Sequence, residues 1–72
     1  MNAKAWLAAY AKRLGIDPPT ADELKAILDL AAEAAHASER IAAPVACWLA
    51  AKAGRSPEES LELARGVAQG SA

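Results

Sequence analysis

The chain has 72 residues with nine acidic and eight basic side chains, so its net charge at pH 7 is −1. It has no block of Lys and Arg that could neutralise phosphates, so nucleic-acid binding is not expected. No apolar stretch reaches the roughly 20 residues of a membrane-spanning helix, and no secretory signal is recognisable. The sequence therefore predicts a soluble, cytoplasmic protein without nucleic-acid or membrane partners.

A chain of this length is near the lower limit for folding around a hydrophobic core alone. The single cysteine, Cys47, cannot form an internal disulfide, and no cluster of Cys and His offers a structural zinc site. Cys47 lies in an apolar run, where we expect a small, buried, unreactive side chain. Alanine contributes 21 residues, which favour helix but supply little volume.

The first helix is predicted over about residues 3–14. Asn2 suits its N-cap, and Gly15 stands where a left-handed residue ends a helix. Trp6, Leu7, Tyr10 and Leu14 recur at helical spacing, and we expect the aromatic side chains of this line, together with Trp48, to lie in the core. The following residues 16–19 end in two prolines, which predict a stiff linker.

The second helix is predicted over about residues 20–42. Thr20 and Glu23 have the spacing of a capping box. The helix is apolar on two faces, which predicts a central helix packed against more than one neighbour. It should end near Ala42, because Pro44 disfavours the helical conformation at Ala43.

Two shorter helices complete the chain, at about residues 44–53 and 56–69. Pro44 suits the first position of the third helix, whose buried face should contain Val45, Trp48, Leu49 and Ala53 before Gly54 ends it. Ser56 and Glu59 repeat the capping box at the fourth helix, and residues 70–72 are expected to form a loose tail. The predicted fold is a compact, all-α, four-helix domain over residues 1–72, with the second helix at its centre.

The polar residues of most interest lie in the second helix and at its end. Asp29, Glu33, His36 and Arg40 are spaced by four, three and four residues, so a continuous helix would place them in one line, with Glu39 beside it. In the structural interpretation these groups form ion pairs, and His36 is bonded to Glu33, to Glu39 or to a neighbouring element.

A second interpretation is a metal- or ligand-binding helical bundle. Glu33 and His36 have the Glu-x-x-His spacing of di-iron carboxylate bundles, but those sites need two such pairs and two further glutamates. One pair per chain could complete a site only in an oligomer. Catalysis is not expected, because Ser38, His36 and Glu39 on one helix cannot form a triad and no glycine-rich nucleotide loop is present. The sequence thus predicts no enzyme activity, no catalytic residue and no cofactor.

Three features together resemble a known family. They are the Trp6-Leu7 pair, the D-L-A-x-x-x-A-H-x-x-E-R motif that ends at Arg40, and Ala42-Ala43-Pro44 followed by an apolar helix that ends at Gly54. This pattern resembles a small actinobacterial domain of unknown function, found alone or joined to the C-terminal side of molybdenum-cofactor guanylyltransferase-like proteins. The resemblance implies an accessory or docking role beside molybdopterin guanine dinucleotide synthesis, without the transferase reaction. It marks His36, Glu39 and Arg40 as motif positions that serve folding or binding.

Self-association is also expected. The second helix is apolar on two faces, and a monomer of four short helices can cover both faces only incompletely. An exposed apolar patch of this kind usually marks an interface. A two-fold homodimer is the commonest way to cover such a patch. We therefore expect a homodimer in which the first or fourth helix completes the surface of the second helix, or docking of the same patch on a larger enzyme.

Overall fold

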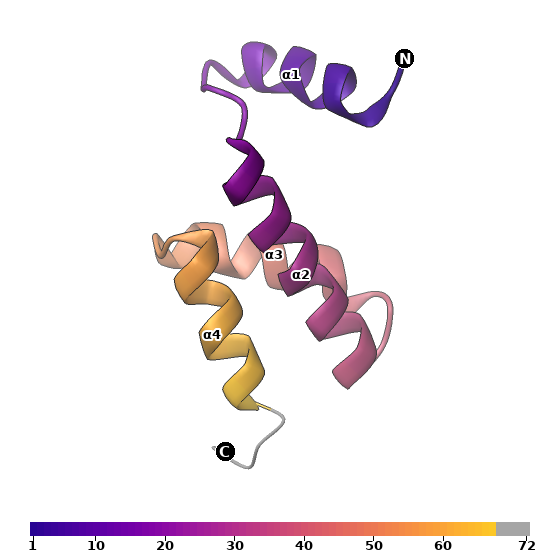
Figure 1. The fold of residues 1–72 in the computed structure, drawn as a ribbon, viewed down its shortest axis with the longest axis vertical. Coiled ribbons are helices and arrows are strands. Elements are labelled where there is room, and N and C mark those ends of the chain that lie inside the picture. Colours follow the sequence, from indigo (N-terminus) through magenta and orange to yellow (C-terminus); the bar gives the residue numbers. More distant parts are fainter. Residues whose placement is uncertain (68–72) are drawn as a thin grey trace.

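The computed structural model describes residues 1–67, which form four helices without a strand (Figure 1). The helices are α1 (Ala3–Leu14), α2 (Ala21–Ala37), α3 (Ala42–Ala53) and α4 (Pro57–Val67). The second helix is central, since it packs against both α3 and α4. The all-α, four-helix prediction with a central second helix is confirmed. The predicted end of the fourth helix at residue 69 and the predicted tail at 70–72 lie outside the described residues.

Capping side chains begin α1 and α2 as predicted. Asn2 Oδ1 accepts a hydrogen bond of 2.8 Å from the Ala5 N–H, and Gly15 ends α1 with a φ of 79°, which suits glycine. At α2, Thr20 Oγ1 accepts from the Glu23 N–H at 3.1 Å, while the Glu23 carboxylate accepts from the Thr20 N–H at 2.9 Å. These reciprocal bonds satisfy N–H groups that have no partner inside the helix.

The end of α2 differs from the prediction, because the helix stops at Ala37 and not near Ala42. Ser38 has a non-helical backbone (φ −141°, ψ −99°). Its N–H and its hydroxyl both donate to the Ala34 carbonyl, at 3.1 and 2.7 Å. A serine side chain that competes for a helix carbonyl favours a break at that point. Glu39 and Arg40 therefore lie in a loop, beyond the end of α2.

The start of α3 is also different, because Ala43 is helical and Pro44 is the third residue of the helix. The prediction that Ala43 is extended or bridging and that Pro44 opens the helix is wrong. Proline is tolerated here because N–H groups of the first turn have no acceptor within the helix. The turn before it is closed by hydrogen bonds from the Ala42 N–H to the Glu39 carbonyl and from the Ala43 N–H to the Arg40 carbonyl.

Gly54 and a second capping box join α3 to α4. Gly54 ends α3 with a φ of 74°. Ser56 Oγ accepts a hydrogen bond of 3.1 Å from the Glu59 N–H, and Glu59 Oε1 accepts from the Ser56 N–H at 3.3 Å. This capping box confirms the prediction made from the sequence for the start of the fourth helix.

A small core lies between α2, α3 and α4. Leu30 and Ala26 of α2 and Leu61 and Ser60 of α4 are its buried residues, and Leu30 is only 4% exposed. The prediction that Trp6, Tyr10 and Trp48 belong to the core is wrong, because these side chains are 53%, 48% and 58% exposed. Cys47 is half-buried, and its thiol donates a long contact of 3.9 Å to the Ile27 carbonyl oxygen. Within the described part of the chain, no helix is long and apolar enough to cross a membrane.

Two serines of the α4 region provide a matched test of this packing. Ser60 is buried, and its hydroxyl finds no hydrogen-bond partner among the described residues. We expect Ser60→Ala to raise the free energy of unfolding by about 0.5–1.5 kcal/mol, because the unpartnered hydroxyl is removed. Ser56→Ala removes a helix cap and should lower it by about 1 kcal/mol. Denaturant unfolding measures both, and equal destabilisation by the two substitutions would contradict the structure.

Burial of Cys47 gives a second prediction. Desolvation raises the pKa of the Cys47 thiol above its ordinary value, so at pH 8 the reactive thiolate is less populated in the folded protein than in the unfolded chain. Iodoacetamide should therefore modify the native protein more slowly than the denatured protein, and the native rate should keep rising at higher pH. Equal rates in the two states would show that Cys47 is not held against α2.

Candidate interaction surface

The most unusual feature of the structure is the orientation of α3. The side of this helix toward α2 and α4 carries small residues, and Ala46, Cys47 and Ala50 are half-buried there. Its large side chains are exposed, and we call Val45, Trp48 and Leu49 the α3 face; all three are more than half exposed. Leu49 lies at the edge of this face, beside the open hollow that α3 shares with α4. The prediction that Val45, Trp48, Leu49 and Ala53 form the buried side of this helix is wrong, since all four are exposed.

Small side chains explain why α3 takes this orientation. Alanines on facing helices allow the helix axes to approach closely, and Cys47 reaches the backbone of α2 at Ile27. A tryptophan or leucine in place of Cys47 would force the two helices apart. The result is a helix that is apolar on both sides, whereas an apolar helix in a soluble protein is normally covered on both sides.

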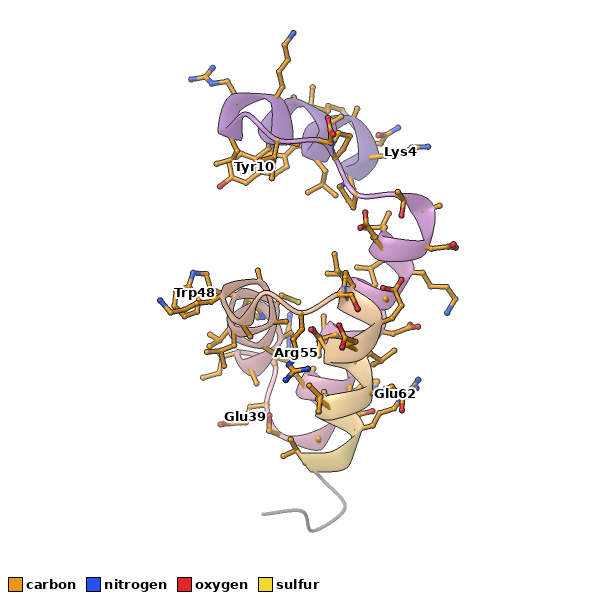
Figure 2. All side chains as sticks on the ribbon, turned by 90° about the vertical axis from the view of Figure 1, so that its left-hand side faces the viewer. Lys4, Tyr10, Glu39, Trp48, Arg55 and Glu62 are labelled. Carbon is orange, nitrogen blue, oxygen red and sulfur yellow. The ribbon has the colours of Figure 1, made fainter. Side chains whose placement is uncertain are left out.

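A second exposed apolar face lies on α1. Trp6, Tyr10 and Leu14 recur at i, i+4 and i+8, and we call these residues the α1 face. The rings of Trp6 and Tyr10 contact each other with centroids 5.1 Å apart. Figure 2 shows Tyr10 and Trp48 on the same side of the molecule, where Trp48 projects away from the body formed by α2 and α4.

The charged side chains of α1 and α3 are all positive; Arg13 and Lys52 lie beside the two apolar faces, whereas Lys4 lies on the opposite side of α1 (Figure 2). Helix α1 contains Lys4, Lys12 and Arg13 without an acidic residue, and α3 contains only Lys52. The Lys52 ammonium lies 5.1 Å from the centre of the Trp48 ring, within cation–π distance. The acidic residues concentrate on the other two helices, with four on α2 and three on α4.

The polar residues predicted as candidates do not come together in one site. Asp29 is half-buried and pairs with Lys25 at 2.9 Å on α2. Glu33 is half-buried at the edge of an apolar hollow of about 440 Å³ between α2, α3 and α4. His36 lies exposed on the last turn of α2, while Glu39 and Arg40 are exposed in the loop that follows.

The predicted pairing of His36 is not found. Among the described residues, neither the His36 side chain nor those of Glu33, Glu39 and Arg40 form a hydrogen bond or an ion pair. The break at Ser38 removes Glu39 and Arg40 from the helical line of His36. Glu33 stays three residues before His36 on the same helix, and the two side chains are not paired. The described residues of one chain also contain no group of three His, Cys, Asp or Glu side chains placed to hold a metal ion.

The residues of the α1 and α3 faces were identified in the sequence, but as core residues. A signal for the alternative is present in residues 43–50, where small residues recur at positions 43, 46 and 50 and large ones at 45, 48 and 49. Helical periodicity separates these two sets. It does not say which of them faces inward, because that depends on how closely the alanine-rich α2 can be approached.

The exposure of His36 leads to a revised expectation for its substitution. His36→Ala should change the free energy of unfolding by less than about 0.5 kcal/mol, as is usual for surface substitutions. Leu30→Ala, in the core of the same helix, should cost about 2–5 kcal/mol. Chemical denaturation at one protein concentration measures both. A loss above 1 kcal/mol for His36→Ala would mean that the side chain has a structural partner.

Comparison with known proteins identifies a family. The profile of a family described as "Domain of unknown function (DUF6457)" matches residues 1–72. Searches of curated proteins and of solved structures gave no significant match. Because the profile covers the whole sequence, the chain belongs to the DUF6457 family of domains of unknown function.

Proposed function

We propose that this domain is a non-enzymatic protein-interaction module that binds through the α1 and α3 faces. The observation that carries the proposal is the orientation of α3, which packs inward through alanine and cysteine and leaves Val45, Trp48 and Leu49 exposed. A soluble monomer gains nothing from exposing a tryptophan and its large apolar neighbours, whereas a binding surface requires them.

The composition of the two faces supports the same function. Tryptophan, tyrosine and leucine supply most of their area, and tryptophan and tyrosine are enriched among the residues that dominate binding energy at protein interfaces. The charged groups at their borders are long, flexible Lys and Arg side chains, as in the polar rim that surrounds an apolar interface centre.

An accessory role beside molybdopterin guanine dinucleotide synthesis is the more specific part of the proposal. It is supported by the resemblance of the Asp29–Arg40 motif and the Ala42-Ala43-Pro44 segment to domains joined to guanylyltransferase-like proteins. In this role the domain would dock on such an enzyme and add no reaction of its own. A cytoplasmic location belongs to the same proposal and is in keeping with one unpaired, half-buried thiol.

Capture from the host that expresses the domain tests the proposal. Tagged native protein, a Trp48→Glu variant and an Ala32→Glu control on the exposed side of α2 would each be incubated with host extract, and bound proteins would be identified by mass spectrometry. Both substitutions place a carboxylate at an exposed position, but only Trp48→Glu alters the α3 face. We expect the native protein and the control to bind the same partners in the same amounts. Trp48→Glu should bind about tenfold less of each partner, or less still.

The identity of the captured proteins tests the specific part. Enrichment of molybdenum-cofactor enzymes with the native protein and the control would support the accessory role. Enrichment of other proteins would support the interaction module and contradict the link to this cofactor. Equal capture by Trp48→Glu and the native protein would contradict binding through the α3 face.

A further inference from the structure

The position of α1 leaves part of the fold open. Helices α3 and α4 both pack against α2, whereas α1 makes no close backbone contact with another helix (Figure 1). It faces only the linker and the first turn of α2, where Leu7 of α1 and Leu24 of α2 line a shared hollow of about 210 Å³. Pro18 and Pro19 lie in this linker and fix its backbone. The molecule measures 39 × 23 × 18 Å, and its radius of gyration is 12.9 Å, compared with about 11 Å for a compact chain of this length.

The accessible surface is correspondingly large. The chain exposes 5734 Å², whereas a compact monomer of 7.4 kDa would expose about 4200 Å². A standard protein interface removes roughly 800 Å² from each partner. The excess surface of one chain is therefore large enough for a complete interface of standard size.

The charges indicate what fits against α1. This helix carries three cations and no carboxylate, while α2 carries Asp22, Glu23, Asp29 and Glu33 against the single Lys25. An α1 helix that lay across the α3 face would bring its apolar residues against Val45, Trp48 and Leu49. The cations of α1 would then approach a body of opposite net charge, since the chain outside α1 carries nine acidic and five basic side chains.

We propose that the two faces are occupied by a second copy of this chain, with α1 of each copy packed on the α3 face of the other. This inference rests on the proposed function, because it names the protein that the two faces bind. The proline linker holds α1 away from its own body, so that the α3 face of another copy is the surface available to it. One two-fold operation then makes the contact twice and covers all four apolar faces of the pair.

Sedimentation equilibrium of the full chain across the micromolar range tests the dimer directly. We expect a mass twice the 7.4 kDa of the chain, with weaker association at high salt because complementary charges contribute. Trp6→Glu on the α1 face and Trp48→Glu on the α3 face should each raise the dissociation constant about tenfold or more. Ala32→Glu, which adds a carboxylate at an exposed position of α2, outside both faces, should leave it unchanged.

A mixture of the two variants tests which helix meets which. In a mixed dimer, the intact α1 face of the Trp48→Glu chain meets the intact α3 face of the Trp6→Glu chain, so one of the two contacts is restored. The mixture should therefore associate more tightly than either variant alone. If α1 packed on α1 and α3 on α3, every contact in a mixed dimer would still contain one carboxylate, and mixing would restore nothing.

Each outcome decides between the two proposals. A native chain that is strictly monomeric at these concentrations would overturn the dimer. In that case, if Trp48→Glu abolished capture of a host protein, the interaction module would stand with a different partner. If the monomeric chain and its Trp48→Glu variant captured host proteins equally, both proposals would fail. A native dimer whose variants are not restored by mixing would overturn the exchange of α1. Circular dichroism of each variant confirms that the helices are retained.

Discussion

The close contact of α3 with α2 is the interaction on which the rest of the structure depends. Ala46, Cys47 and Ala50 form the inner side of α3, and the Cys47 sulfur lies 3.9 Å from the carbonyl oxygen of Ile27. Small side chains allow this approach, and the core that results contains only two buried leucines, Leu30 and Leu61. Because α3 turns its small residues toward α2, the same contact that forms the body of the domain leaves the larger residues of α3 exposed.

This arrangement connects a small core with a binding role. A chain of 72 residues cannot bury as large a fraction of its surface as a larger domain can. Here the two tryptophans and the only tyrosine stay outside the core, on α1 and α3. The favourable free energy of burying these three side chains is gained only when a partner covers them. Binding and stability are then linked, because any partner that covers these faces favours the folded chain.

Local features were predictable from the sequence, and features that depend on distant contacts were not. The capping boxes at Thr20 and Ser56 and the glycines at 15 and 54 act within a few residues, and the structure contains each of them as predicted. The end of α2 was predicted too late, because Ser38 gives a weaker stop signal than glycine or proline. The inward side of α3 depends on contact with a helix about 20 residues away, and apolar periodicity alone favoured the larger side chains. The predicted helical line of Asp29, Glu33, His36 and Arg40 does not extend to Arg40, because α2 already ends at Ala37.

The orientation of α3 is the central claim, and a pair of substitutions tests it most directly. The free energy of unfolding would be measured for Cys47→Leu and Trp48→Ala at a protein concentration low enough to exclude association. Cys47→Leu should destabilise the chain by about 1–3 kcal/mol, because the Cys47 sulfur already lies 3.9 Å from the Ile27 carbonyl oxygen and a larger side chain would push α3 away from α2. Trp48→Ala should cost less than about 1 kcal/mol, whereas truncating a buried tryptophan costs about 3–5 kcal/mol. The opposite pattern, with Cys47→Leu tolerated and Trp48→Ala strongly destabilising, would show that α3 faces inward through its large residues and would contradict this account.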